Sequence, residues 1–185
     1  MTNAKSVARV FEYLGLQTEG KPVEKTRLNK LLYFAQGHAF AALDRPLFIN
    51  QIDAWDHGPV VAVVYSGFNK IVQQARDEGL SSLQLSPEEM DVIMDVWAQY
   101  HHFSANELVN LTHQPGSPWS ETYDPNVKNA HISLEKIKSY FAQPENRLKR
   151  VLGDCSSLPV VHALPSDEYD PQEDAVWEAL LHDAE

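Results

Sequence analysis

Apolar residues recur at helical spacing through most of the first 142 residues, and this pattern constrains the fold more than any other feature. In residues 7–14 the apolar positions are separated by three or four residues, which places them on one face of a helix. Gly15 or Gly20 is expected to end that helix. The same spacing continues through residues 28–43, where aromatic residues widen the apolar face. We therefore expect a second helix that is buried on most of its sides.

Short polar signatures mark helix starts further along the chain. Residues 86–89 read Ser-Pro-Glu-Glu, which combines an N-cap hydroxyl, a proline in the first turn and a carboxylate three residues after the cap. Residues 104–107 repeat the hydroxyl and the carboxylate at the same spacing. Ser133 precedes another apolar stripe, over residues 137–141. These signatures predict three more helices.

The segment between residues 49 and 57 departs from the helical pattern. It is short and mixed, and Ile52 and Ala54 alternate with Asp53 and Trp55 as in a half-exposed strand. Apolar residues between 60 and 72 then resume helical spacing, so Pro59 is expected in the first turn of a helix. The predicted fold is mainly α, a compact helical domain of about six helices with a short β element near residues 49–57, followed by a C-terminal acidic extension.

Charge divides the chain into two predicted parts, a helical domain over residues 1–142 and an acidic extension over residues 143–185. The formal net charge is −11, and the segment from residue 154 to 185 holds nine acidic residues and no Lys or Arg. A cap signature at residues 170–173 and the apolar stripe after it predict a terminal amphipathic helix. This helix packs on its own domain, across a homodimer, or on a partner. Its charge repels nucleic acid and favours a basic protein partner, so direct nucleic-acid binding is not expected.

The amino-acid composition and the spacing of potential ligand and catalytic residues argue against several classes of function. The single Cys155 excludes an intramolecular disulfide and a multi-cysteine zinc site, and the eight His residues show no recognised metal-ligand spacing. Glycine-rich phosphate-binding motifs and a nucleophile elbow are absent. We therefore expect no enzyme activity, no catalytic residue, no metal and no cofactor. No signal peptide or membrane-spanning apolar run is recognised, so a cytoplasmic location without membrane association is expected.

The stretch Ala-Trp-Asp-His-Gly-Pro at residues 54–59 has two compatible explanations. The first is a structural joint, in which a strand ends at His57, Gly58 supplies a permissive turn and Pro59 presets the backbone for a helix. The second is a protein-binding hot spot, because large aromatic residues such as Trp55 on a rigid corner are typical of such sites. The sequence favours the joint, and one segment can serve both roles.

Three stretches together point to a known family: KLLYFAQGH at residues 30–38, AWDHGPVVAVVY at 54–65, and LTHQPGSPW at 111–119. In order and spacing they resemble the Panacea domain, the SocA-like antitoxin domain found in prophage-associated genes. The resemblance covers roughly residues 5–142 and implies a mostly helical, non-enzymatic domain that binds and neutralises a toxin encoded beside it. Several motif residues are expected first in the core, namely Leu31, Leu32, Tyr33, Trp55, Val63 and Tyr65. Thr112, His113 and Trp119 are compatible with either packing or binding.

The resemblance implies a cognate toxin as the protein partner. An adaptor that delivers a bound toxin to an ATP-dependent protease is the alternative, with the acidic extension as a docking peptide, and an unrecognised hydrolase is a third hypothesis. A homodimer is also compatible with the terminal helix. The candidate partner-binding residues are Trp55, His57, Gly58, Pro59, His113, Trp119, Trp177, Leu180 and Leu181.

Overall fold

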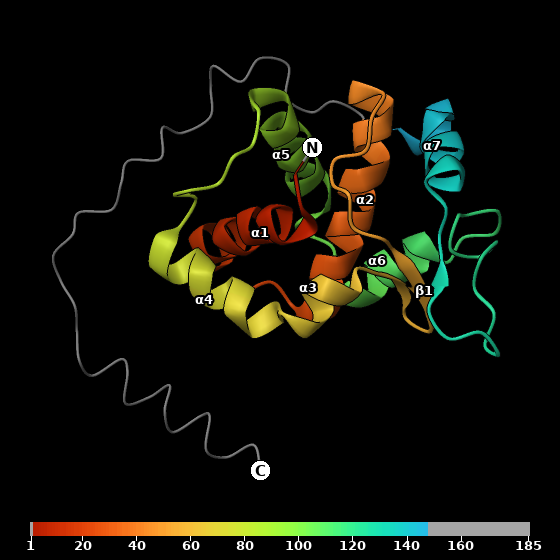
Figure 1. The fold of residues 1–185 in the computed structure, drawn as a ribbon, viewed down its shortest axis with the longest axis horizontal. Coiled ribbons are helices and arrows are strands. Elements are labelled where there is room, and N and C mark those ends of the chain that lie inside the picture. The colour runs from red at the N-terminus through yellow and green to blue at the C-terminus, as the bar shows by residue number, and fades with distance from the viewer. Residues whose placement is uncertain (1, 148–185) are drawn as a thin grey trace, which may run out of the picture. The chain divides into compact units, whose positions relative to one another are not determined.

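Helix α2, Lys25–Leu43, is the element against which much of the domain packs. The computed structural model describes residues 2–147 and shows a mainly helical domain with a small sheet beside α2 (Figure 1). Every residue of α2 from Arg27 to Ala39 is buried, as its wide apolar face predicts. The other helices are α1 Ala4–Glu19, α3 Ala62–Ser66, α4 Phe68–Glu78, α5 Pro87–Tyr100, α6 Ala105–Thr112, α7 Leu134–Ala142 and a short 3-10 helix, Pro144–Asn146.

The predicted helix starts are confirmed by the hydrogen bonds at their caps. Ser86 and Ser104 each form a complete capping box with the glutamate three residues later, and the Ser133 side chain accepts from the Lys136 amide. Helix α1 ends at Gly20, whose left-handed backbone (φ 69°) is the usual C-terminal conformation for glycine. Local chemistry therefore sets these boundaries.

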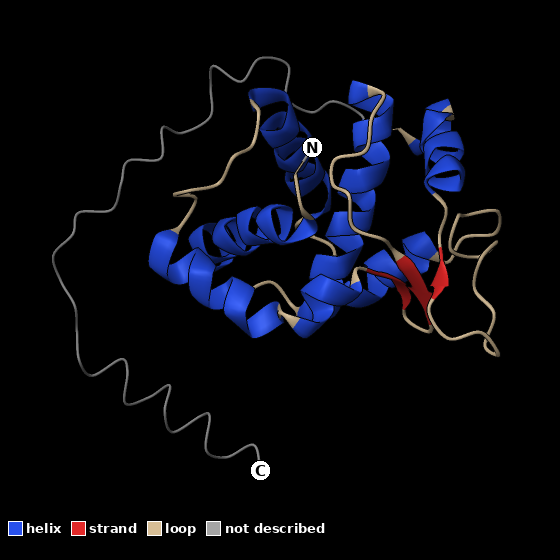
Figure 2. Cartoon of the chain, viewed as in Figure 1, coloured by secondary structure: helices blue, strands red, loops and turns tan. Residues whose placement is uncertain are grey.

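The β element is a three-stranded antiparallel sheet of order β2-β1-β3, drawn in red in Figure 2. β1 is Asp53–Trp55, β2 is Gly58–Val60 and β3 is Ala130–His131. Asp53 pairs with Val60 in β2 and with His131 in β3, so the middle strand joins two segments far apart in sequence. The expectation of a half-exposed strand was wrong, because Ile52, Asp53 and Ala54 are all buried. The Asp53 carboxylate is accommodated by a hydrogen bond with the His131 ring.

The corner after β1 differs from its prediction. Pro59 lies in β2 and not in the first turn of a helix, since the backbone from residue 58 to 60 pairs with β1. The following helical segment is divided at Gly67 into α3 and α4. Val63 and Tyr65 in α3 are exposed by 40% and 39%, so the expectation that they lie in the core was also wrong. Leu31, Leu32 and Tyr33 are fully buried, as expected.

The core between α2 and its neighbouring helices is rich in aromatic rings. Phe34 stacks on Tyr100 with ring centroids 4.4 Å apart, and Phe141 of α7 meets Tyr33 edge to face. Within residues 2–147 no helix combines the length and hydrophobicity needed to span a bilayer. The predicted terminal helix, with Trp177, Leu180 and Leu181, lies outside the residues that the structure describes.

Candidate functional site

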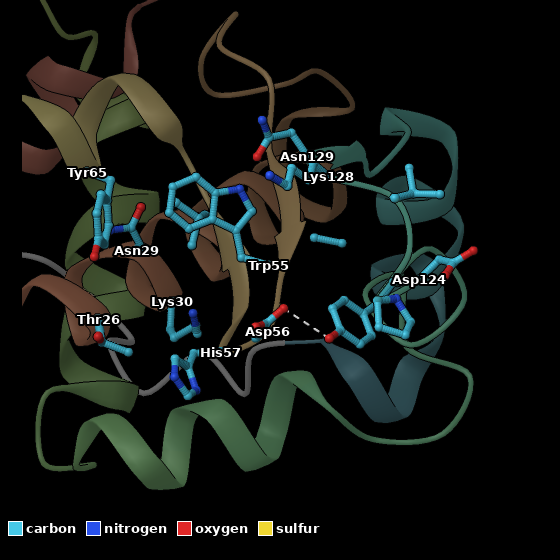
Figure 3. Close-up of a pocket in the computed structure, with 15 residues that line it drawn as sticks. Thr26, Asn29, Lys30, Trp55, Asp56, His57, Tyr65, Asp124, Lys128 and Asn129 are labelled. Carbon is cyan, nitrogen blue, oxygen red and sulfur yellow. Dashed lines mark hydrogen bonds between the residues drawn. The ribbon is translucent and has the colours of Figure 1, made fainter.

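A cavity of about 480 Å³ opens beside the corner between β1 and β2 (Figure 3). Its walls come from the N-terminal half of α2, the corner itself, Tyr65 of α3 and the loop before β3. The lining residues are Thr26, Asn29, Lys30, Ala54, Trp55, Asp56, His57, Val60, Tyr65, Tyr123, Asp124, Pro125, Val127, Lys128 and Asn129. Segments separated by about a hundred positions thus meet at one place on the surface.

Two neighbouring polar residues of α2 hold strand β2 in place behind this cavity. The Asn29 side-chain oxygen accepts from the Val61 amide at 2.9 Å, and the Lys30 Nζ donates to the Pro59 carbonyl at 3.1 Å. Gly58 has φ 94°, and a Cβ atom there would lie 2.8 Å from both Lys30 Cε and Thr112 Oγ1. Only glycine fits this backbone conformation at such a close approach. The first two sequence motifs are therefore packed directly against each other.

The third motif packs on the same corner from the other side. The Trp119 indole N–H donates to the Trp55 carbonyl at 2.9 Å. The His113 ring stacks on Trp119 with centroids 3.6 Å apart, and Tyr123 stacks on Trp119 at 4.7 Å. Because Trp119 is buried and both its faces are covered, it fixes the position of the corner. A structural joint is present, but it connects two paired strands and not a strand and a helix as predicted, and it combines all three motifs.

Lys30 is the unusual residue of this joint, because it is fully buried. Burial lowers the pKa of its amine to about 7. No carboxylate forms an ion pair with Lys30 among residues 2–147. The pKa of His113 is also lowered, first by burial and then by the positive charges of Lys30 and His57. Basic groups therefore gather behind the cavity without an acidic partner.

The rim of the cavity is aromatic and partly exposed. The Trp55 and Tyr65 rings meet edge to face with centroids 5.0 Å apart, and the Lys25 ammonium lies 4.7 Å from the centroid of Tyr65. The Tyr123 hydroxyl donates to an Asp56 carboxylate oxygen at 3.0 Å, drawn as the dashed line in Figure 3. Val127 on the loop is 50% exposed. This rim offers apolar and hydrogen-bonding groups to a ligand.

The structure distributes the predicted site residues over different environments. Trp55 and His57 line the cavity, and His113 is half-buried behind it. Gly58, Pro59 and Trp119 are buried, so they hold the corner and offer little surface of their own.

Of the fifteen residues that line the cavity, only Trp55 and His57 were predicted from the sequence as site residues, and four of the others matter most for binding. Lys30 was quoted only as part of a motif, and Tyr65 was assigned to the core. Tyr123 and Val127 lie in an irregular segment that carries no recognisable motif. The partial signal for Tyr65 was its place on α3, five residues after the strand that ends at Val60.

Among residues 2–147 no group of three or more His, Cys, Asp or Glu side chains is placed to hold a metal ion. The polar groups of the cavity are instead suited to hydrogen bonding and charge pairing. The Trp55 indole nitrogen is buried and has no hydrogen-bond partner within the described part of the chain.

Comparison with known proteins places the same region in one family. A family model described as antitoxin SocA-like, Panacea domain, matches residues 28–120, which include most of α2, the corner, and His113 and Trp119. A curated relative, Antitoxin SocA from Caulobacter vibrioides (strain NA1000 / CB15N), is 33% identical over 110 residues. That alignment covers 53% of this chain and 58% of the relative, so the chain spans little more than half of that protein. No solved structure matches the chain.

Proposed function

This chain belongs to the SocA-like antitoxin family defined by the Panacea domain, and on that premise we propose that it neutralises a cognate toxin by binding it directly. The observation that carries this proposal is the cavity at the corner. The matched region contains the joint, whose segments are held together by hydrogen bonds from Asn29, Lys30 and Trp119, and an aromatic rim lies beside it. A catalytic arrangement would require a nucleophile held beside an oriented base. The cavity instead offers the groups that protein partners bind.

We assign toxin docking to the corner face, defined as Trp55, His57, Tyr65, Tyr123 and Val127. Binding hot spots are enriched in tryptophan and tyrosine that sit in well-packed surroundings. Trp55 meets this description, because its backbone is held by Trp119 and its ring by Tyr65. Since the joint fixes the rim before a partner arrives, little conformational entropy is lost on binding.

A second feature that supports the corner face is its mixture of exposed apolar and basic groups. Tyr65 and Val127 are two of the larger exposed apolar side chains among the described residues. Lys25 lies over the Tyr65 ring, and Lys128 lines the cavity. Exposed apolar groups beside charged ones are typical of the edge of a protein interface.

Co-expression with the adjacent small open reading frame tests this function. The parent chain should restore growth when that frame is lethal alone, and Tyr65→Ala or Val127→Ser should weaken the rescue. Ile49→Ser is the matched control, because Ile49 is also an exposed aliphatic residue, at 69%, but does not line the cavity. Equal rescue by Val127→Ser and Ile49→Ser, at equal protein levels, would remove the corner face from the docking site.

Delivery of the bound toxin to an ATP-dependent protease remains the alternative consequence of the same binding. The acidic charge of residues 143–185 suggests this delivery mechanism. We propose that these residues form a separate part of the chain. Rescue in a strain without the protease separates the two mechanisms. Direct neutralisation predicts unchanged rescue and stable toxin, whereas an adaptor predicts lost rescue. Deleting residues 166–185 should abolish rescue only if that segment contacts the toxin or the protease.

A further inference from the structure

The cavity at the corner contains two buried hydrogen-bond donors that the described residues leave short of acceptors. Lys30 Nζ carries up to three protons but donates only to the Pro59 carbonyl. The Trp55 indole N–H has no acceptor among residues 2–147. Buried polar groups are nearly always paired in folded proteins, so two such donors on one cavity need an explanation.

The side-chain acceptors of the same cavity that have a recorded hydrogen bond accept from groups other than Lys30 and the Trp55 indole. Asp56 accepts from the Tyr123 hydroxyl, and Asp124 accepts from the Asn126 amide at 2.8 Å. The Asn29 side-chain oxygen is occupied by the Val61 amide. Among the described residues no carboxylate or amide oxygen of the cavity pairs with Lys30 or with the Trp55 indole, so a negatively charged acceptor from a ligand would match these donors.

The shape and the rim of the cavity narrow the choice of ligand. About 480 Å³ is room for two or three side chains and not for a folded element. The Trp55 and Tyr65 rings form an apolar wall. Lys128, which lines the cavity, and Lys25, which lies over the Tyr65 ring, add positive charge that offsets the Asp56 and Asp124 carboxylates. An extended peptide presents side chains and backbone carbonyls together, which suits this combination of groups.

We infer that the cavity binds an extended acidic segment of the partner protein, with a carboxylate directed at Lys30 and a carbonyl oxygen accepting from the Trp55 indole N–H. An aliphatic side chain next to the acidic one packs on the Trp55 and Tyr65 rings. This inference rests on the proposed function for the identity of the partner, but its chemistry comes from the cavity alone. It explains why a lysine is buried without a counter-charge in a part of the fold that neutral residues would fill.

Binding of an acidic segment should depend on pH through the protonation of Lys30. A carboxylate near a buried amine favours the charged form, so binding should be accompanied by proton uptake at Lys30. The affinity for an acidic segment is then expected to fall as the pH rises above 7, by up to about tenfold per pH unit. His57 from the corner, His113 at the end of α6 and Asp56 of the rim are the other ionisable groups near Lys30.

The test measures the binding of two short peptides to the 185-residue chain, labelled with nitrogen-15, by the shifts of its amide and indole resonances. The probe is acetyl-Gly-Glu-Leu-Gly-amide, and its neutral isostere acetyl-Gly-Gln-Leu-Gly-amide is the control. The acidic peptide should shift the Trp55 indole resonance and bind at least about tenfold more tightly at pH 6 than its isostere. The preference should fall between pH 6 and pH 8. It should persist in His57→Gln and in His113→Gln, which together assign the pH dependence to Lys30.

Variants of this chain decide the assignment of the two donors. Lys30→Met should abolish the preference for the acidic peptide, while Trp55→Phe should weaken both peptides because it removes only the indole donor. Ile49→Ser should behave as the parent. If Lys30→Met does not fold, the pH dependence of the parent and the Trp55→Phe result still decide the matter.

Equal binding of the two peptides, no binding at millimolar concentration, or resonance shifts confined to another surface would overturn the inference. A failure of the peptides combined with loss of toxin rescue in the corner variants leaves the proposed function standing. If the cavity prefers the acidic peptide but Tyr65→Ala and Val127→Ser still rescue cells, the proposed docking site would be contradicted instead.

Discussion

Gln36 and Lys30 are both buried polar residues of α2, and they differ in how completely the fold satisfies them. The Gln36 side chain accepts from the Leu47 and Phe48 amides and donates to the Phe48 carbonyl, at 3.0–3.1 Å. Lys30 makes one hydrogen bond, to the Pro59 carbonyl. Both residues pin a connecting segment onto α2. The contact of Gln36 with Leu47 and Phe48, here called the Gln36 joint, uses both polar atoms of the side chain in three hydrogen bonds. Lys30 makes one recorded hydrogen bond and lines a cavity that a ligand can enter.

Buried polar groups that serve packing differ from those that serve binding in how far the protein itself fills their hydrogen bonds. A residue that only stabilises the fold is expected to have its hydrogen bonds filled by the protein itself. A residue that also serves binding keeps donors that the protein leaves unfilled, at a cost in stability. The largest effects on folding should therefore come from groups that complete the corner or the Gln36 joint, and the smallest from Lys30.

The largest expected loss of stability is at Trp119. Trp119→Ala removes the stacking contacts with His113 and Tyr123 and the hydrogen bond to the Trp55 carbonyl. It should lower the free energy of unfolding by about 3–5 kcal/mol. Trp55→Ala should cost about half as much, because Trp55 is only half-buried and its indole nitrogen has no hydrogen-bond partner within residues 2–147. Equilibrium urea unfolding measures both. Equal losses would show that Trp55 is as structural as Trp119.

The Gln36 joint should be the next most sensitive position. Gln36→Leu leaves two amides and one carbonyl without partners, and should lower the free energy of unfolding by about 3 kcal/mol. Gln73→Leu on the exposed face of α4 is the control and should change stability by less than about 0.5 kcal/mol. If Gln36→Leu were as mild as Gln73→Leu, the claim of a complete structural joint would be wrong.

Substitution of Gly58 should lower stability moderately, for two reasons: steric contact of the new side chain and backbone strain. Gly58→Ala is expected to cost about 2–3 kcal/mol, because the new Cβ meets Lys30 and Thr112 and the backbone has a positive φ. Gly116→Ala has φ 76° but open space around it, so it should cost only about 1 kcal/mol of backbone strain. Thermal melts of the two variants compare the causes. Identical losses would mean that the close approach at the corner is easily relaxed.

The pH dependence of stability distinguishes Lys30 from Glu12, the other fully buried charged group whose pKa is moved to about 7. Burial raises the pKa of Glu12, so between pH 4.5 and 7 the native state binds more protons at this carboxyl than the unfolded state does. The free energy of unfolding therefore falls as the pH rises through that range. Burial lowers the pKa of Lys30, so the native state binds fewer protons than the unfolded state between pH 7 and 10.5, and stability rises with pH there.

Each slope is at most about 1.4 kcal/mol per pH unit. Glu12→Gln should remove the first dependence and Lys30→Met the second, when each variant is subtracted from the parent across the pH range. A difference curve for Lys30→Met that stays flat between pH 7 and 10 would show that the amine is not buried in solution.

Helices were predictable from the sequence because their determinants are local. The capping hydroxyls at residues 86, 104 and 133 act on amides within the same turn, so the signature and the structure coincide. The sheet was not predictable, since β1 pairs with β3 across 78 positions and β3 contributes only two residues. Pro59 was misplaced for the same reason, because its pairing with Ala54 overrides the preference of proline for a helix start.

The candidate site was predictable only in part. Trp55 and His57 were identified because aromatic and polar residues at a rigid corner stand out in sequence. Lys30 did not stand out, since lysine is rarely buried and nothing nearby in sequence indicates that the corner covers it. Tyr123 and Val127 reach the cavity through a loop whose position depends on tertiary packing.

The most direct test of the account is the stability of Lys30→Met at pH 7, measured by urea unfolding beside Gln36→Leu. Methionine keeps the length of the side chain, removes a charge that is costly to bury, and loses only the hydrogen bond to Pro59. The free energy of unfolding of Lys30→Met is expected to lie within about 1 kcal/mol of the parent's, or above it, and the variant should lose its preference for an acidic peptide. A loss of stability as large as that of Gln36→Leu would contradict a binding role for Lys30, because the lysine would then be a structural residue.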